Sequence, residues 1–270
     1  MPWVLRGLRN GVVTSRWPRR RDAYFDEFVA SVDVVGDATA ARRAMESARV
    51  DGRRLCPTDA IEVIGSAVAL DRGRCILCGH CVAAAPDVFA WRRGADTARL
   101  QRQALVVGDV DEDDESLQEL RAALAHRVRR LRRSVHIRHV DAGSDGSDEW
   151  EIQALVNPVY DIHRLGIFFT ASPRHADILL VTGIGTGGML RALARTREAM
   201  PDPVVVIAAG TDAVSGGLMG GGYTFGNGVG SALNVDVWIP GSPASPFSLL
   251  QGILLGLDRL PALPTAGEPS

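Results

Sequence analysis

This 270-residue sequence has no lysine, so all 30 of its basic residues are arginine. With 32 acidic residues the formal net charge is −2, which excludes a general electrostatic grip on nucleic acid. The longest nearly apolar run, residues 246–257, is about two-thirds of a bilayer span, so no transmembrane helix is expected. The first residues also lack the apolar stretch of a signal peptide. We therefore expect a cytoplasmic protein with reduced thiols.

Cysteine is scarce, and its four copies lie close together in the first third of the chain. Cys75, Cys78 and Cys81 are each separated by two residues, and Cys56 directly precedes Pro57. Three thiolates at this spacing, completed by a distant Cys-Pro, are typical of an iron–sulfur centre. Zinc is the alternative, but zinc sites usually use two separate Cys-x2-Cys pairs. The pattern predicts one 4Fe–4S cluster held by these four cysteines.

Charge is unevenly distributed along the chain. Residues 1–21 carry six arginines and no acid, residues 109–119 carry seven acids, and residues 121–138 carry seven arginines and no acid. An apolar stripe at helical spacing predicts a helix over residues 116–133, and it consists of Leu117, Leu120, Leu124, Val128 and Leu131. This segment is interpreted either as a solvated connector or as a docking surface for an acidic partner subunit.

The second half alternates apolar strand patterns with helical patterns. Strands are expected at residues 135–140, 178–182, 204–209 and 235–239, and helices at residues 189–200 and 247–260. This alternation predicts an α/β fold with an open, mostly parallel sheet. We expect three parts, which are residues 1–110, an acidic linker with a basic connector helix at 111–133, and residues 134–270.

The first part resembles the bacterial two-cluster ferredoxin module. In that module Cys-x2-Cys-x2-Cys-x3-Cys-Pro occurs twice, and each fourth cysteine serves the other cluster. The ligands of the second cluster would fall on Glu46, Arg49, Gly52 and Ala85. The resemblance implies a small α+β ferredoxin-like domain that keeps one complete ligand set and has lost the other. It also implies paired strands at residues 60–64 and 69–71.

The segment Gly11-Val-Val-Thr-x3-Pro18 is similar to the lead-in of ferredoxin subunits of membrane-bound hydrogenases and respiratory complex I. Those subunits lie against a membrane arm. The resemblance implies that the arginines of residues 1–21 contact anionic lipid or a partner subunit. A disordered basic tail is the alternative.

Residues 134–260 resemble the small subunit of complex I and of energy-converting nickel–iron hydrogenases, a flavodoxin-like domain. The matching blocks are Asn157-Pro-x-Tyr160-Asp-Ile-x-Arg164-x-Gly166-Ile, Ser172-Pro-Arg-His-Ala-Asp177, Met200-Pro-x-Pro203, Ala213-x-Ser215-Gly-Gly217 and Val237-x-Ile-Pro-Gly241-x-Pro243. That family holds a terminal 4Fe–4S cluster on four cysteines. This chain has Asp145, Asp148, Asp212 and Ser242 at those positions. Carboxylates are hard ligands and do not suit such a cluster, so the site is degenerate.

Two interpretations of the degenerate site stay open. It is either a relic, filled by hydrogen bonds, water or ion pairs with arginines such as Arg164 and Arg174, or a site where Asp145, Asp148 and Asp212 bind Mg²⁺ or Ca²⁺. Buried carboxylates without a counter-charge are costly. A cation or a bound proton must therefore be nearby.

A glycine motif, Gly183-x-Gly185-x-x-Gly188, follows one predicted strand and opens a helix, as a dinucleotide fingerprint does. The expected acidic partner about 20 residues later is not clearly present. In the resembled family this loop is a tight turn that binds no nucleotide. The glycine-rich residues 220–228 are expected to form a loop against a partner subunit. No catalytic residue is identified.

The sequence as a whole resembles a fusion of two peripheral-arm subunits. We expect an electron-transfer subunit with one 4Fe–4S cluster, docked on a hydrogenase-like large subunit and on membrane-arm subunits. One alternative is a mainly structural subunit of a non-redox, ion-translocating assembly related to complex I. The other is a nucleotide-dependent oxidoreductase.

Overall fold

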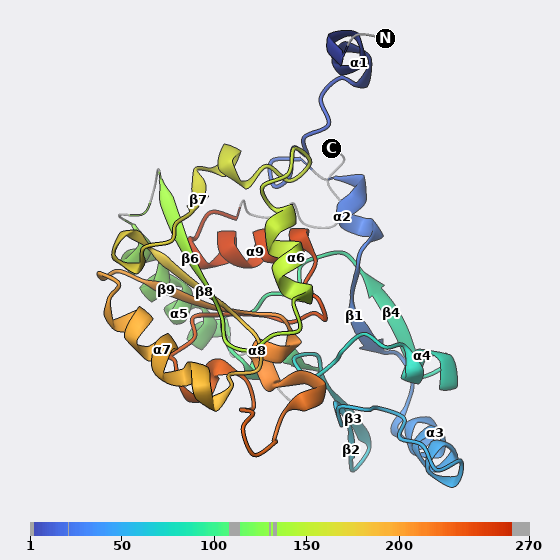
Figure 1. Ribbon diagram of the computed structural model, residues 1–270. Coiled ribbons are helices and arrows are strands. Elements are labelled where there is room, and N and C mark those ends of the chain that lie inside the picture. The colour runs from blue at the N-terminus through green and yellow to red at the C-terminus, as the bar shows by residue number, and fades with distance from the viewer. Residues whose placement is uncertain (1–2, 21, 108–113, 130, 132–133, 261–270) are drawn as a thin grey trace.

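The computed structural model describes residues 3–20, 22–107, 114–129, 131 and 134–260. A parallel sheet with helices on both faces forms the larger part, and two small antiparallel sheets lie to one side of it (Figure 1). The described helices include none that is both long and apolar enough to cross a membrane.

The first half builds the two antiparallel sheets. Its elements are α1 (Trp3–Asn10), α2 (Ala23–Glu27), β1 (Val29–Val34), α3 (Ala38–Val50), β2 (Ile61–Ile64), β3 (Ala67–Asp71), α4 (His80–Ala84), β4 (Phe89–Arg93), η1 (Gln103–Leu105) and β5 (Val106–Val107). β1 pairs with β4, and β3 pairs with both β2 and β5. The predicted pairing of the strands at residues 60–64 and 69–71 is confirmed. Val32, Leu70, Val88 and Phe89 fill the core beneath them.

The second half builds the parallel sheet. Its elements are α5 (Asp114–Val128), β6 (Val135–Asp141), α6 (Ser147–Ala154), η2 (Ile162–Leu165), β7 (Ile167–Phe169), η3 (Pro173–His175), β8 (Ile178–Thr182), α7 (Gly187–Glu198), β9 (Val205–Ala209), α8 (Thr211–Ser215), η4 (Gly217–Met219), η5 (Val229–Ser231), β10 (Val237–Ile239) and α9 (Pro246–Gly256). The strand order β7-β6-β8-β9-β10, all parallel, is the 2-1-3-4-5 order of flavodoxin-like sheets. The predicted open parallel sheet is confirmed.

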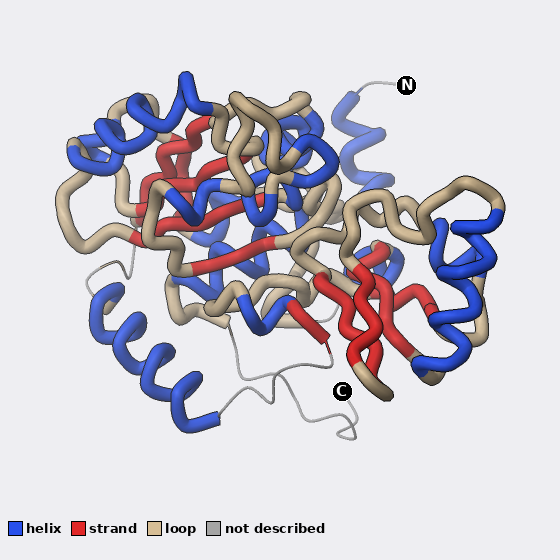
Figure 2. Tube along the Cα trace, turned by 90° about the horizontal axis from the view of Figure 1, so that it is seen from below, coloured by secondary structure: helices blue, strands red, loops and turns tan. Residues whose placement is uncertain are grey.

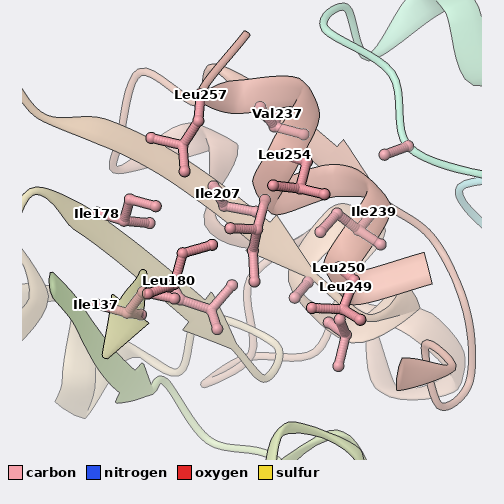
Figure 3. Packing of buried hydrophobic residues seen from close by; sticks show 14 of the residues in the cluster. Ile137, Ile178, Leu180, Ile207, Val237, Ile239, Leu249, Leu250, Leu254 and Leu257 are labelled. Atoms are coloured by element: carbon pink, nitrogen blue, oxygen red, sulfur yellow. The ribbon is translucent and has the colours of Figure 1, made fainter. Parts of the chain in front are cut away.

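Alternation along β8 shows that the sheet is buried on both faces. Ile178 and Leu180 join the core beneath α9, whereas Leu179 and Val181 point to the opposite face and join the core that includes Leu193 of α7. Figure 3 shows Ile178 and Leu180 together with Leu254 of α9. Burial on both faces is why the strands read as continuous apolar runs. The seam, meaning the region where the first half of the chain contacts the second half, lies next to this sheet (Figure 2).

Helix boundaries differ from those predicted for identifiable reasons. α9 begins at Pro246 because Ser245 accepts a hydrogen bond from the Ser248 amide at 3.2 Å and proline suits the first helical position. It ends at Gly256 rather than at residue 260, since Asp258 adopts a φ of +52°. The edge strand β7 was not predicted. The acidic run at residues 109–113 and the end of the predicted connector at residues 132–133 lie outside the described residues.

An aromatic cluster packs the N-terminal segment against the second half of the chain. Phe247 of α9 meets Trp17, Phe25, Phe28 and Tyr160, with ring centroids 5.8, 5.6, 6.0 and 5.1 Å away. Trp17 also stacks on Phe25 at 5.6 Å. Aromatic pairs at these separations are favourable beyond their apolar burial. The two halves therefore share one core, and the division at residues 110 and 134 stays a prediction.

Candidate functional site

The loop between β3 and α4 carries the predicted ligands Cys75 and Cys78, and the first turn of α4 carries Cys81. Leu77 and Gly79 have φ values of +56° and +75°, and this left-handed backbone turns the chain sharply between Cys75 and Cys81. A side chain at Gly79 would place its Cβ 2.9 Å from the Trp91 ring. Gly79 is therefore required both by its conformation and by the available space. Cys75 is half-buried, Cys78 is exposed and Cys81 is buried.

The fourth predicted ligand comes from the segment before β2. Its sulfur, Cys56 Sγ, accepts a hydrogen bond from the Ala60 amide at 3.2 Å and lies 3.4 Å from the Thr58 hydroxyl. Hydrogen bonds to ligand sulfurs are one of the ways in which a protein sets the potential of an iron–sulfur cluster. These two contacts fix the position of the Cys56 sulfur.

The four thiols act on one another electrostatically. The pKa of Cys75 is raised to about 11, chiefly by burial and also by the charges of Cys81, Cys56 and Cys78, against a backbone hydrogen bond at Leu77 that lowers it. Burial likewise raises the pKa of Cys81 to about 11, with contributions from Cys56 and Cys78. All four cysteines are free. Metal binding at this site must therefore displace protons, as thiolate ligation does.

The spacing of these side chains bears on the choice of metal. In the ranges described, no three His, Cys, Asp or Glu side chains lie close enough together to ligate one metal ion. Zinc would draw its sulfurs to about 2.3 Å from a single point. A four-iron cluster is a larger body than a single zinc ion, so it does not require the sulfurs to converge on one point.

Asp148 stands at the first turn of α6, at a position where the resembled family has a cysteine. Its side chain is buried, and Oδ1 accepts a hydrogen bond from the Ala244 amide at 3.0 Å. Burial raises the pKa of Asp148 to about 7, and the charges of Asp212, Glu149 and Asp145 add to the effect of burial. This carboxyl is therefore about half protonated at neutral pH, so it can both hold and release a proton there.

The other degenerate positions are less enclosed. Asp145 is exposed, and its Oδ1 accepts hydrogen bonds from the Ser147 amide at 2.9 Å and hydroxyl at 2.6 Å, which lower its pKa. Asp212 is half-buried, and its pKa is raised by burial and then by the charges of Asp145 and Glu149. Ser242 is exposed. The structure thus brings the three carboxyls within electrostatic reach, but not into the tight group that one cation requires.

Arg164, one of the arginines considered as an ion-pair partner for the degenerate site, does not fill that role in the structure. Arg164 donates to the main-chain carbonyls of Trp17 and Tyr160 instead. Arg164 contacts the N-terminal segment near Trp17 because it lies in η2, directly before the edge strand β7. Arg174, the other candidate, has an exposed side chain. A bound proton on Asp148 explains the buried carboxyl without any arginine.

A polar chain beside Asp148 was not predicted from the sequence. The Ser144 hydroxyl donates to Glu149 Oε2 at 2.7 Å, and the Thr182 hydroxyl donates to Glu149 Oε1. His139 Nε2 lies 2.9 Å from the Thr182 oxygen, so the Nε2–H tautomer fits this network. Burial lowers the pKa of His139 although Glu149 and Asp141 oppose this shift. His139 and Thr182 lie toward the carboxyl ends of parallel strands. Functional sites of open α/β sheets form at these ends, so the sequence positions of the two residues could have pointed to this network.

Thr211 joins the cysteine loop to the degenerate site. Its hydroxyl donates to the Cys75 carbonyl at 3.1 Å and accepts from the Gly241 amide at 3.2 Å. Thr211 is fully buried at the start of α8, between Gly210 and Asp212. The predicted cluster site and the degenerate site are therefore neighbours across the seam between the two halves.

The glycine motif after β8 makes a tight turn packed against protein. A Cβ at Gly183 would lie 2.6 Å from the main-chain carbon of Gly143, and the Gly187 amide donates to the Thr224 carbonyl at 3.0 Å. Loop backbone from residues 220–228 thus covers the start of α7, where a nucleotide phosphate would bind. This geometry disfavours the nucleotide-binding hypothesis.

Comparisons with known proteins match both halves. Residues 146–255 match the family described as NADH ubiquinone oxidoreductase, 20 Kd subunit. Residues 68–123 match the 4Fe-4S single cluster domain, which spans Cys75, Cys78 and Cys81 but begins after Cys56.

Three relatives illustrate the likeness. Formate hydrogenlyase subunit 7 of Escherichia coli is 37% identical over 54% of this chain and 56% of its own length. A probable membrane-bound hydrogenase subunit of Pyrococcus furiosus, mbhJ, is 36% identical over 52% of this chain and 84% of its own length. An NADH-quinone oxidoreductase subunit of Citrifermentans bemidjiense is 41% identical over 41% of this chain and 64% of its own length.

The share of each relative that is covered differs. This chain spans little more than half of the formate hydrogenlyase subunit but most of the probable hydrogenase subunit. The five-stranded parallel sheet lies largely within the matched residues 146–255. By sequence match and by its relatives, this chain belongs to the NADH ubiquinone oxidoreductase 20 kDa subunit family.

Proposed function

We propose that this chain is a peripheral iron–sulfur subunit of a membrane-bound assembly related to hydrogenases and complex I. It holds one 4Fe–4S cluster on Cys56, Cys75, Cys78 and Cys81. The observation that supports the proposal is that the four cysteines, from two separate segments, lie within electrostatic reach of one another in a partly buried region. When bound, the cluster supplies one-electron transfer.

The chain's own residues would give this cluster its setting. The Ala60 amide bonds the Cys56 sulfur, and buried Cys81 keeps water from one side. Cys78 is exposed, so electrons would be exchanged with a partner on that side. Thr211 fixes the loop carbonyl at Cys75. The parts at residues 1–110, 111–133 and 134–270 act together, because the cluster loop rests on the second half.

The second half would have a docking role in place of a cluster. Asp148 is satisfied by the Ala244 amide, and Asp145 by Ser147. These hydrogen bonds keep the degenerate site folded without metal. The named relatives are subunits of hydrogenase, formate hydrogenlyase and NADH-quinone oxidoreductase. We infer a hydrogenase-like large subunit and membrane-arm subunits as partners, with the exposed Leu218, Met219 and Tyr223 as a candidate contact.

The N-terminal segment would hold the subunit at the cytoplasmic face of a membrane. α1 has no buried residue, and Trp3 and Leu8 are exposed while Arg6 and Arg9 lie on its other side. A basic depression of about 530 Å³ lies at the root of this segment, and its arginines are Arg16, Arg19, Arg20 and Arg164. An apolar face with flanking arginines is typical of helices that bind anionic membrane surfaces.

Iron and acid-labile sulfide per chain, with EPR of the reduced protein, test the cluster assignment. Purification without oxygen should yield about four irons per chain. Cys78→Ser should lose or alter the EPR signal, whereas the matched control Ser242→Ala should leave it unchanged. Eight irons would refute the degenerate second site. No iron in protein purified with its partners would refute the cluster.

A mainly structural role is the second candidate. The observation that favours it is the replacement of all four family ligands by Asp145, Asp148, Asp212 and Ser242. Electron transfer through this chain would then have no terminal relay. Co-purification and turnover of the Cys78→Ser complex separate the candidates. If the subunit is structural, the variant keeps its partners and the assembly keeps its turnover, whereas if it is an electron carrier, turnover is lost.

A further inference from the structure

The segment Gly210–Asp212 contacts both the cysteine loop and the degenerate site. Thr211 Oγ1 donates to the Cys75 carbonyl at 3.1 Å. The preceding residue, Gly210, lies against the Asp148 carboxylate, where a Cβ would come within 1.9 Å of Oδ2. Asp148 is thus separated from the cysteine loop by one short stretch of backbone.

The surroundings of Asp148 are shaped for a carboxyl group. Its side chain is 3% exposed, and Gly210, with a φ of +88°, leaves the space that the carboxyl fills. The Ala244 amide donates to Oδ1 at 3.0 Å. A carboxyl in this place carries one hydrogen bond from the backbone whether or not it holds a proton.

The charged groups around Asp148 are mainly acidic. Asp145 precedes α6, Glu149 lies on α6, and Asp212 lies on α8. β6 contributes His139, which burial keeps neutral, and Asp141. The face of α9 that packs against α6 contributes no titratable side chain, since the sequence of α9 contains none. Burial and these like charges raise the pKa of Asp148 to about 7.

We propose that Asp148 takes up a proton when the neighbouring cluster takes up an electron. This inference rests on the proposed function, because it requires the cluster on the four cysteines. A one-electron reductant supplies the electron, and water supplies the proton, which forms an O–H bond on the Asp148 carboxylate. Reoxidation returns the electron to the acceptor and the proton to water.

The coupling follows from electrostatics across the short segment Gly210–Asp212. An electron added to the cluster places a negative charge near a carboxylate in a poorly solvated region, and this raises its affinity for a proton. The effect is reciprocal, so a proton on Asp148 makes the cluster easier to reduce by the same factor. The lost cluster site would then serve as a proton site tied to the remaining cluster.

Redox titration of the full chain, followed by EPR at several pH values between 6 and 8, tests this directly. The wild-type midpoint should fall as pH rises above about 7, where the oxidised protein loses the Asp148 proton, and the slope should approach a tenfold change in the reduction equilibrium per pH unit, which is 59 mV for one electron. Asp148→Asn keeps an oxygen for the Ala244 amide and should abolish the slope. Asp145→Asn, an exposed neighbour, should keep it.

Infrared redox difference spectra give a second readout on the wild-type protein. Reduction should produce a protonated-carboxyl band that shifts in heavy water and is missing in Asp148→Asn. A normal cluster signal with a pH-independent midpoint overturns the coupling alone. A slope that persists in Asp148→Asn overturns the choice of residue. Loss of any cluster signal in the wild type overturns the proposed function as well.

Discussion

Asp148→Asn should change how the stability of this protein depends on pH. The pKa of Asp148 rises from 3.8 to about 7 in the folded protein, chiefly through burial. Between these values the folded protein holds a proton that the unfolded chain releases, so stability falls as pH rises. A difference of about 3 between the two pKa values corresponds to about 4 kcal/mol, of which about 2 kcal/mol is lost between pH 5 and pH 7.

The asparagine variant has no proton to lose, and its amide oxygen can still accept from the Ala244 amide. Its free energy of unfolding should therefore exceed that of the wild type above pH 7, and the gap should close toward pH 5. Urea unfolding of both proteins, with matched iron content, measures this difference at each pH. Asp145→Asn, whose exposed carboxyl has a lowered pKa, should not show the effect. Parallel curves for wild type and Asp148→Asn from pH 5 to pH 8 would refute the reasoning.

Three further substitutions test the packing around the site by urea unfolding. Phe247→Ala should cost about 3–5 kcal/mol, because it empties the centre of the aromatic cluster, and a cost below 1 kcal/mol would contradict this. Thr211→Val should lower the free energy of unfolding by about 1–3 kcal/mol, because the Cys75 carbonyl and the Gly241 amide lose their hydrogen-bond partner. It should also shift the cluster potential. An unchanged potential would contradict the link between Thr211 and the cysteine loop. Gly210→Ala should destabilise strongly since its Cβ meets Asp148, whereas Gly188→Ala, with open space around it, should be tolerated.

The strand order and the ligand positions differ in how far the sequence reveals them. Apolar runs at residues 178–182 and 204–209 predict buried parallel strands, and both are found almost residue for residue. β7 was missed because three residues carry too little periodicity to be recognised. The end of α9 was placed too late, since a single left-handed residue at Asp258 stops the helix without proline or glycine.

The candidate site, too, has features that the sequence reveals and features that it does not. The spacing of the cysteines and the loss of the four family ligands are predicted from the linear sequence. The environment of each group could not be predicted from it. Arg164 was expected beside the lost ligands but lies by Trp17, and the contact of Glu149 with Thr182 and His139 joins residues distant along the chain.

The sequence by itself determined the alternation of strands and helices, the spacing of the four cysteines, and the presence of Asp145, Asp148, Asp212 and Ser242 where the resembled family has cysteines. These depend on local spacing and residue type, which the chain carries everywhere along its length. Only the tertiary structure decided that Asp148 is buried, that Gly210 makes room for it and that Thr211 holds the cysteine loop beside it. Burial and pKa depend on which distant segments meet, because the cost of charging a carboxyl is set by the solvent and charges that surround it.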